Sequence, residues 1–226
     1  EQERHILKEI ISNRKIAGVI LCPADSGKKQ NQKLVNCGRP FVCMERMIEG
    51  EEADAVISDN VQGLRTGTGH LIKCGHERIA LLLEDKALST VKGRREGYLQ
   101  ALREYDVPCD EDLIACVGLD DGEEAKESIK AFIKKMSPTA ILAGGNTLTL
   151  RCLKAMGEMG LECPKDISIV GFGDDKWCEL ITPALTTLIQ DTEEIGRKTV
   201  HLLLNKIEGV TQERYAAQKI VVPMEL

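Results

Sequence analysis

Polar residues follow six of the apolar runs in this sequence, at positions where a folded chain could gather them around a small molecule. Carboxylate, amide and hydroxyl groups occur there together with an arginine, Arg94, and this mixture suits a polyol or a carboxylate as ligand. Each group alone is also a common cap or turn residue, so the hypothesis of a binding site depends on their convergence. The six sites are Glu45-Arg46, Ser58-Asp59-Asn60, Arg94, Gly145-Asn146, Asp174-Asp175 and Gln190-Asp191.

No combination of residues predicts catalysis, a cofactor or a metal. The sequence has no G-x-S-x-G and no G-x-x-x-x-G-K-[ST] motif. The G-T-G at 67–69 fails as a dinucleotide loop because the third glycine would fall on Ile72. His70, Cys74 and His76 have no second pair of ligands downstream, so a structural or interface role is the better interpretation. We therefore expect no enzyme, no cofactor and no metal site.

The overall composition predicts a globular protein with no strong attraction for nucleic acid. Of the 226 residues, 42% are hydrophobic and 29% are charged, and the net charge is −6. An acidic segment has no electrostatic reason to bind a phosphate backbone, so any contact with DNA must come from another segment. The sequence opens without a signal peptide and has no apolar run of the ~18 residues needed to span a membrane. We expect a cytoplasmic protein without membrane contact.

The nine cysteines do not suggest a disulfide framework. Their number is odd, their spacing is irregular, and there is no C-x-x-C. Many lie in apolar runs, as Cys22, Cys43 and Cys152 do. We expect buried free thiols in a reducing compartment.

Short apolar runs alternate with longer segments of helical period, which predicts an α/β fold. The expected strands are 17–21, 40–44, 55–58, 79–83, 113–117, 140–143, 167–172 and 219–222. The expected helices are 4–12, 63–73, 92–105, 123–135, 147–158 and 192–207. Apolar strands that are each followed by a helix form parallel sheets covered on both faces. Ligands of such sheets bind at the carboxyl ends of the strands, where the polar residues above are found.

The chain opens on a helix that leads into its first strand, with no strand before it. Because crossovers normally link strand to strand, we expect that a strand–helix–strand segment is missing before residue 1. The sequence is thus interpreted as a portion of a longer polypeptide.

Five motifs in a fixed order resemble the effector-binding domain of transcriptional regulators of the lactose/galactose-repressor (LacI/GalR) type. The resemblance extends over essentially the whole chain, and five linked motifs are far more specific than one. The motifs are IAGVIL with GRPFVCMER, SDNVQGLRTGTGHLIKCGHERIALL, RREGY, SPTAILAGGN, and CPKDISIVGFGDDKWCELITPALTTLIQD.

The resemblance implies a two-lobed, periplasmic-binding-protein-like (type I) α/β fold. Parallel sheets flanked by helices form both lobes, three crossovers join them, and the effector binds in the cleft between them. Residues 1–58 and 190–217 are expected to form the N-terminal lobe. Residues 59–189 and 218–226 are expected to form the C-terminal lobe.

The resemblance also assigns site residues. Arg94 matches the arginine that grips the effector, and Glu45 matches the acid at a strand end of the first lobe. Ser58 and Asp59 lie at the first crossover, and Gln190 lies at the second.

Two positions of the expected site depart from the family pattern. Gly145-Asn146 stands where the family has an Asn-Asp pair, and Gly173 replaces the first Asp of the "GfDD" motif, leaving Asp174 at the second position. Both departures remove polar side chains, so we expect a roomier and less negative pocket. This favours an anionic effector, such as a sugar acid or a phosphorylated sugar, although a neutral sugar in a roomier pocket is the alternative.

The implied function is that of a ligand-responsive regulator of sugar or sugar-acid metabolism, in which effector binding changes the angle between the lobes. Such a regulator is a homodimer, with helices 63–73 and 192–207 as expected contacts. It binds operator DNA through a helix-turn-helix that this chain does not contain. A periplasmic sugar-binding protein of a transporter shares the fold and is the alternative.

Overall fold

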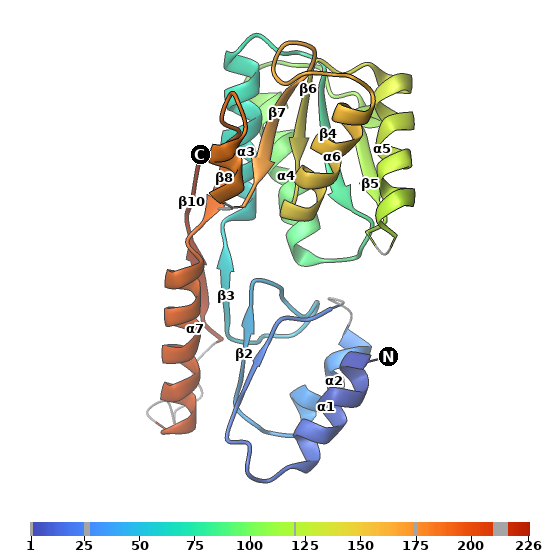
Figure 1. Cartoon of the computed structure of the whole chain (residues 1–226). Helices are drawn as coiled ribbons and strands as arrows, with labels where there is room; N and C mark the ends of the chain where they lie inside the picture. The colour runs from blue at the N-terminus through green and yellow to red at the C-terminus, as the bar shows by residue number, and fades with distance from the viewer. Residues whose placement is uncertain (1, 25–27, 120, 174–175, 210–216) are drawn as a thin grey trace. The chain divides into compact units, whose positions relative to one another are not determined.

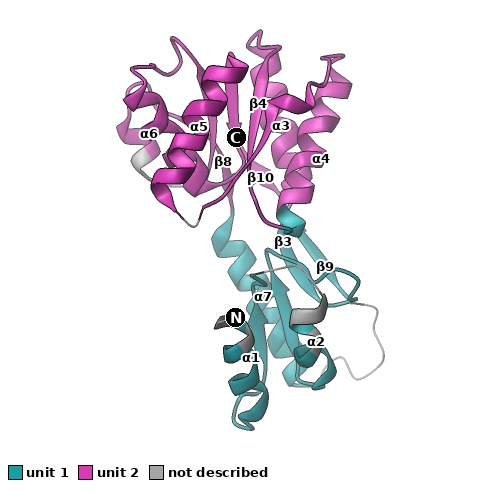
Figure 2. Cartoon of the chain, turned by 90° about the vertical axis from the view of Figure 1, so that its right-hand side faces the viewer, with its two compact units in different colours: residues 1–58, 87–90, 191–222 teal, residues 59–86, 91–190, 223–226 magenta. Residues whose placement is uncertain are grey.

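The computed structural model describes residues 2–24, 28–119, 121–173, 176–209 and 217–226. The chain divides into two compact units, coloured separately in Figure 2. Unit 1 comprises Glu1–Ser58, Ala87–Thr90 and Asp191–Val222, and unit 2 comprises Asp59–Lys86, Val91–Gln190 and Pro223–Leu226. Both units are α/β, as predicted.

Unit 1 contains a parallel sheet of four strands with helices on both faces (Figure 1). The strand order is β1 (Val19–Leu21), β2 (Phe41–Met44), β3 (Ala55–Ser58) and β9 (Lys219–Val222). Successive side chains of β2 point to opposite faces. Cys43 therefore packs with residues of α1 (Gln2–Ser12) and α2 (Lys28–Asn36), while Val42 packs with residues of α7 (Thr192–Ile207).

Unit 2 contains a six-stranded sheet that is parallel except at one edge. Its strand order is β10 (Met224–Glu225), β8 (Thr186–Gln190), β7 (Ser168–Phe172), β6 (Ala140–Ala143), β4 (Ile79–Glu84) and β5 (Ile114–Val117). Two 3-10 turns, Glu111–Leu113 and Lys176–Leu180, precede β5 and β8. Only β10 is antiparallel to its neighbour.

Two helices cover each face of this second sheet, which explains why its central strands are apolar throughout. Ile79, Leu81 and Leu83 of β4 belong to the core beneath α3 (Asn60–Lys73) and α4 (Ser89–Glu104). Ala80 and Leu82 of the same strand belong to the core beneath α5 (Gly122–Met136) and α6 (Asn146–Glu158). A strand buried on both faces offers no polar side chain to a ligand, so only its ends can contribute to a site.

The prediction for the C-terminal segment was wrong in part. Residues 218–226 were expected in the second lobe, but β9 pairs along its length with β3 in unit 1. The chain passes into unit 2 only at Pro223, after which β10 pairs with β8. Proline has no N–H to donate to the ladder, which suits the point where β9 ends.

The expectation of buried thiols was also wrong for most of the cysteines. All nine are free, and only Cys43, Cys152 and Cys178 are buried. The exposed thiols include Cys22, just beyond the end of β1, and Cys116, on the edge strand β5. None of the described helices is long and apolar enough to cross a membrane.

Candidate functional site

Arg94 lies near the start of α4 and is held at the carboxyl-terminal edge of the unit 2 sheet. Its Nε donates to Asn60 Oδ1 at 2.8 Å, and its Nη1 donates to the carbonyl oxygen of Gly144, just after β6, at 2.7 Å. The guanidinium carbon lies 4.1 Å from the centre of the Phe172 ring, at the end of β7. Stacking on an aromatic face and two hydrogen bonds fix the plane of the guanidinium. The arginine is therefore preorganised, and it is only partly buried.

Gly97 in the motif RREGY allows α4 to approach α3 closely enough to place Arg94 beside Asn60. A Cβ atom at position 97 would lie 2.1 Å from the carbonyl oxygen of Val61 in α3. Tyr98 anchors the same turn, because its buried hydroxyl donates to the carbonyl oxygen of Ile79 at 2.8 Å. Burial raises the pKa of Tyr98 far above its usual value, so this hydroxyl remains a donor at all physiological pH values. The motif thus positions Arg94, which lies one helical turn before Gly97.

Of the positions that depart from the family pattern, Gly145 lies next to this arginine and Gly173 lies next to Asn146. A Cβ atom at Gly145 would be 3.7 Å from Arg94 Nη1. Gly173 has a φ of +112°, and a Cβ atom there would be 3.2 Å from Cγ of Asn146. Gly145, Asn146 and Gly173 therefore form one group around the ends of β6 and β7. Asp174, predicted with them, lies outside the described residues.

Thr149 holds these two strand ends together from within. Its buried hydroxyl donates to the carbonyl oxygen of Gly145 at 3.0 Å and accepts from the backbone N–H of Phe172 at 3.0 Å. The N–H of Gly173 donates to the carbonyl oxygen of Leu188 in β8 at 2.8 Å. Backbone groups near the arginine are thus satisfied by the protein itself.

Unit 1 carries a second polar pair at the carboxyl ends of its strands. Glu45 follows β2 with a left-handed φ of 63°. Its Oε1 accepts from the backbone N–H of Ser58 at 3.0 Å and from the Ser58 hydroxyl at 2.8 Å. Ser58, the last residue of β3, is only 1% exposed. The structure therefore brings together Glu45 and Ser58, two of the residues predicted for the site.

Asp59 and Gln190 have local roles in the structure. Asp59 caps α3 by accepting from the N–H of Gln62 at 2.9 Å, the cap role that was the simpler alternative for it. Asp191 caps α7 in the same way through the N–H of Glu194 at 2.8 Å. Gln190 ends β8 and is paired across the sheet with Met224.

Of the three residues that contact Arg94, Asn60 was among the polar residues expected at the site, whereas Gly144 and Phe172 were not. Asn60 was expected because it follows Ser58 and Asp59 at the end of a predicted strand. Gly144 contributes only a carbonyl oxygen, and Phe172 only a ring face. Neither contribution can be recognised from residue type alone.

In the cluster of His70, Cys74 and His76, the contacts of His76 serve the packing of the unit 2 sheet at its amino-terminal edge. The His76 ring nitrogens lie 3.1 Å from the Thr139 hydroxyl and 2.9 Å from the Ser168 hydroxyl, at the starts of β6 and β7. Burial lowers the pKa of His76, so the ring is held in its neutral form. Within the part of the chain that the structure describes, no three His, Cys, Asp or Glu residues are placed to hold a metal.

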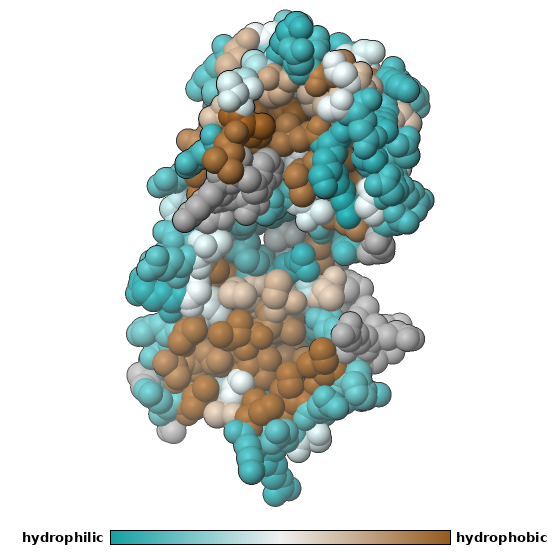
Figure 3. All heavy atoms as spheres, viewed as in Figure 1, coloured by the Kyte–Doolittle hydropathy of each residue, from teal (hydrophilic) through white to brown (hydrophobic). Residues whose placement is uncertain are grey.

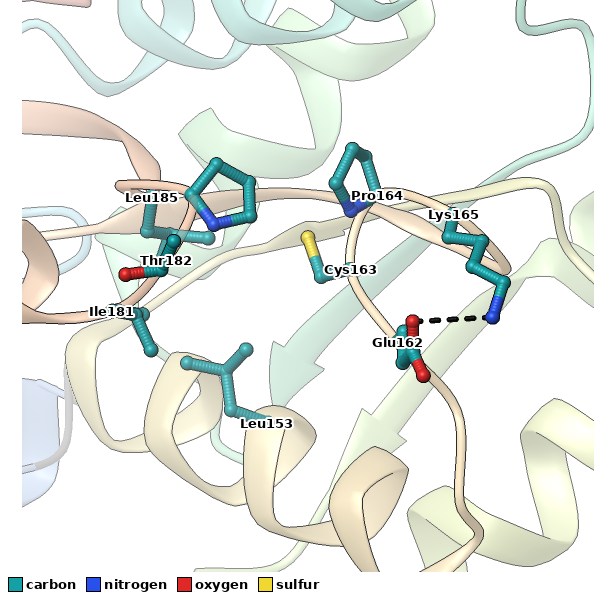
Figure 4. A pocket seen from close by; sticks show the side chains of 9 residues that line it. Leu153, Glu162, Cys163, Pro164, Lys165, Ile181, Thr182 and Leu185 are labelled. Atoms are coloured by element: carbon teal, nitrogen blue, oxygen red, sulfur yellow. Dashed lines mark hydrogen bonds and ion pairs between the residues drawn. The ribbon is translucent and has the colours of Figure 1, made fainter.

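A pocket of about 470 Å³ opens beside the segments that precede β7 and β8 (Figure 4). Its walls are mainly apolar, with Leu153, Pro164 and Leu185 among the lining residues. Its charged groups, Glu162 and Lys165, pair with each other at 3.2 Å. The pocket lies at the amino ends of these strands and lacks the mixture of donors and acceptors found around Arg94.

The fold and the polar strand ends define a ligand-binding protein of the periplasmic-binding-protein type. The periplasmic binding protein-like domain family matches residues 68–226, and the chain belongs to this family. It is 29% identical over 223 residues to the "Probable HTH-type transcriptional regulator EndR" of Paenibacillus polymyxa. That match covers 97% of this chain and 65% of the relative, so this chain spans less than two thirds of the relative's length.

Solved structures show the same fold over nearly the whole chain. The "transcriptional regulator CelR-cellobiose complex" matches with a TM-score of 0.88 and 25% identity, covering 98% of this chain and 68% of that one. A LacI family transcriptional regulator from Enterococcus faecium with bound ribose matches with a TM-score of 0.83 and 27% identity, covering 99% and 81% of the two chains. These comparisons confirm the predicted resemblance to LacI-type regulators. All three relatives are named as regulators, not as enzymes or transport proteins.

Proposed function

We propose that this chain is the effector-binding portion of a ligand-responsive bacterial transcriptional regulator of sugar or sugar-acid metabolism, that it acts in the cytoplasm, and that it is not an enzyme. Operator DNA is bound, in this proposal, through a helix-turn-helix that is not part of this chain. The observation that carries the proposal is the preorganised arginine of unit 2, with its guanidinium fixed at the carboxyl ends of the strands. The named functions of the relatives favour a regulator over a transport protein.

The residues proposed to contact the effector are charged residues, polar residues and glycines. A sugar, a sugar acid or a phosphorylated sugar presents hydroxyl groups that carboxylates and amides bind, and Arg94 supplies a charged donor. Gly145 has no side chain beside the arginine, and Gly173 has none beside Asn146. The residues are Arg94, Gln190, Asp59, Gly145, Asn146, Gly173 and Asp174 of unit 2, with Glu45 and Ser58 of unit 1.

A thermal-shift screen of the purified chain against sugars, sugar acids, phosphorylated sugars and nucleobases tests this function. A ligand that binds the folded chain raises the unfolding temperature in a concentration-dependent manner. We expect a shift with at least one sugar or sugar derivative. Stabilisation by nucleobases alone, or by none of these compounds, would contradict the proposed ligand class.

Replacing Arg94 by alanine should abolish the response to the effector while leaving the chain folded. Losing a charged hydrogen-bond donor to a bound ligand costs on the order of 2–4 kcal/mol, a loss of roughly 30- to 700-fold in affinity. Calorimetric titration of the effector found in the screen measures this loss. Arg95→Ala is the matched control, since Arg95 follows in the same helix and pairs with Glu111 instead. Equal affinity in wild type and Arg94→Ala would remove Arg94 from the site.

We further propose that the regulator is a homodimer and that α7 contributes to its interface, together with α3. Val200, Leu204 and Ile207 recur at positions i, i+4 and i+7 of α7 and remain 46%, 47% and 38% exposed. This spacing places them on one side of the helix. Apolar residues also gather on the face of unit 1 seen in Figure 3. An apolar stripe of this kind is typical of a surface that another chain covers.

Substituting Leu204 by glutamate should convert the dimer to a monomer, because an interface core does not accept an unpaired carboxylate. Light scattering coupled to size-exclusion chromatography should show about twice the 24.9 kDa chain mass for wild type and the chain mass for the variant. Leu150→Glu is the control, as Leu150 is a comparably exposed leucine (40%) on α6. A wild-type chain that is monomeric at micromolar concentration would contradict the proposal.

A further inference from the structure

Cys74 and His70 form a thiol–imidazole pair at the C-terminal end of α3, at the opposite edge of the unit 2 sheet from Arg94. Cys74 is the C-cap residue of the helix, and its Sγ lies 3.8 Å from Nε2 of His70, one turn earlier. Residues spaced i and i+4 lie on the same side of a helix, so α3 itself positions the two groups. When Nε2 is the unprotonated ring nitrogen, it can accept the thiol proton, as the base does in other pairs with a nucleophilic thiol.

The surroundings of Cys74 differ from those of the other four exposed cysteines. The Cys37 thiol donates to the carbonyl oxygen of Leu34 at 3.0 Å, a backbone group that cannot take its proton. Burial raises the pKa of each of the other three thiols, and neighbouring carboxylates raise it further. These three thiols are Cys22, Cys109 and Cys116. Among the residues that the structure describes, Cys74 is thus the exposed thiol with an imidazole in contact.

A second pocket of unit 2, of about 200 Å³, opens beside this pair. His70 and Cys74 both line it, and so do the apolar residues Leu71, Ile169 and Leu185. Leu71 and Ile169 belong to the two cores of unit 2, so the packing of the sheet fixes this apolar part of the wall. A small molecule with a hydrocarbon part can therefore lie against the thiol.

The end of α3 suits His70 to the role of a base. The last carbonyl groups of a helix favour a cation, so they stabilise the imidazolium that forms when His70 takes a proton. The same carbonyl groups disfavour a free thiolate, so the proton should leave the sulfur only as the sulfur forms a new bond. His76, in the same pocket, is already engaged by the hydroxyl groups of Thr139 and Ser168.

We propose that Cys74 is a covalent modification site for a small α,β-unsaturated carbonyl compound and that His70 is the base of this reaction. The polarisable sulfur bonds to the β-carbon of the electrophile, and the π electrons of its C=C bond move toward the carbonyl group. The thiol proton passes to His70 Nε2 and from there to the α-carbon. The product is a thioether that retains the carbonyl group, so the addition releases nothing and consumes no oxidant. This site uses none of the residues proposed to contact the effector.

Timed labelling of the whole chain with methyl vinyl ketone, followed by peptide mass spectrometry, tests this inference. We expect Cys74 to react at least about tenfold faster than each of the other exposed thiols, because a positioned base accelerates proton transfer. His70→Gln should remove this advantage and leave the other labelling rates unchanged. His201→Gln is the matched control, since His201 also lies on a helix, 3.4 Å from the Asn205 side chain one turn away. It should leave the labelling of Cys74 unchanged.

The comparison among thiols of the wild-type chain does not depend on any variant. Similar rates at all the exposed thiols, or faster labelling of one other than Cys74, would overturn the inference. Selective labelling of Cys74 that persists in His70→Gln would reject His70 as the base. The buried thiols of Cys43 and Cys152 should stay unlabelled in every variant, which shows that the chains remain folded. The thermal-shift screen for the effector decides the proposed function separately.

Discussion

Replacing Gly97 by alanine should destabilise the chain and remove effector binding together. The added Cβ would lie 2.1 Å from the carbonyl oxygen of Val61 and 3.0 Å from the backbone nitrogen of Arg65. Both atoms belong to the backbone of α3, so no side-chain rotation can relieve the overlap, and α3 and α4 must separate. Overpacking of this kind costs about 3 kcal/mol or more, which corresponds to a fall of roughly 6–12 °C in the unfolding temperature. Separation of the helices also pulls Arg94 away from Asn60, so effector affinity should fall as well.

Gly157→Ala is the control for this experiment. Gly157 also lies inside a helix, α6, but a Cβ atom there would meet no atom within 4 Å. Alanine is the better helix former by about 1 kcal/mol, so this variant should unfold at the same or a higher temperature. Unfolding temperatures that fall equally in both variants would mean that helix contact is not the cause. An unchanged temperature in Gly97→Ala would contradict the close approach of α3 and α4.

Replacing Lys206 by methionine should produce the second large loss, this time in unit 1. Lys206 Nζ, near the end of α7, pairs with Asp54 Oδ2, and the other oxygen of Asp54 accepts from the N–H of Gln218 at 2.6 Å. Asp54 thus connects the segments before β3 and β9 to Lys206 of α7. The Asp54 side chain is 11% exposed, so removing the lysine leaves a nearly buried carboxylate without its cation. Breaking such a pair costs about 3 kcal/mol or more in the free energy of unfolding.

A double-mutant cycle separates this charge effect from lost packing. Asp54→Asn keeps an acceptor for Gln218, and Lys206→Met keeps an apolar stem beside Phe41. The double variant should be more stable than the sum of the two single losses predicts, because it buries no unpaired charge. Chemical denaturation of the four proteins measures the cycle. Strictly additive losses would show that the two side chains do not interact.

The alternation of apolar runs and helical segments was sufficient to predict most of the fold. β4 illustrates why, since an apolar strand needs cover on both faces and the sequence supplies helices on either side. α2 was not predicted because its sequence, KKQNQKLVN, has too few apolar residues to show a helical period. The pairing of β9 with β3 could not be predicted either, since a short strand with three apolar residues can extend any open sheet edge.

Sequence analysis could predict only those site residues that contribute a charged or polar side chain. Arg94 and the pair Glu45 and Ser58 were found from their charge and polarity at strand ends. Two of the groups that orient Arg94, the carbonyl oxygen of Gly144 and the ring of Phe172, were missed, because a carbonyl oxygen belongs to every residue and a ring face to every aromatic one. The sequence could not show whether Asp59 caps a helix or binds the ligand, since both roles use the same carboxylate oxygen atoms.

The scaffold around Arg94 separates the parts of the site that mutation can change from those it cannot. The carbonyl oxygen of Gly144 cannot be removed by any substitution, and a Cβ atom at this position would meet the carbonyl oxygen of Leu82 at 2.8 Å. A side chain at position 144 is therefore disfavoured, and the backbone acceptor is present in every variant. Gly145 and Asn146 next to it carry no such constraint, since a Cβ at Gly145 finds ordinary contacts and Asn146 is exposed. Codon libraries restricted to these two positions should yield variants with altered ligand preference that still hold the arginine.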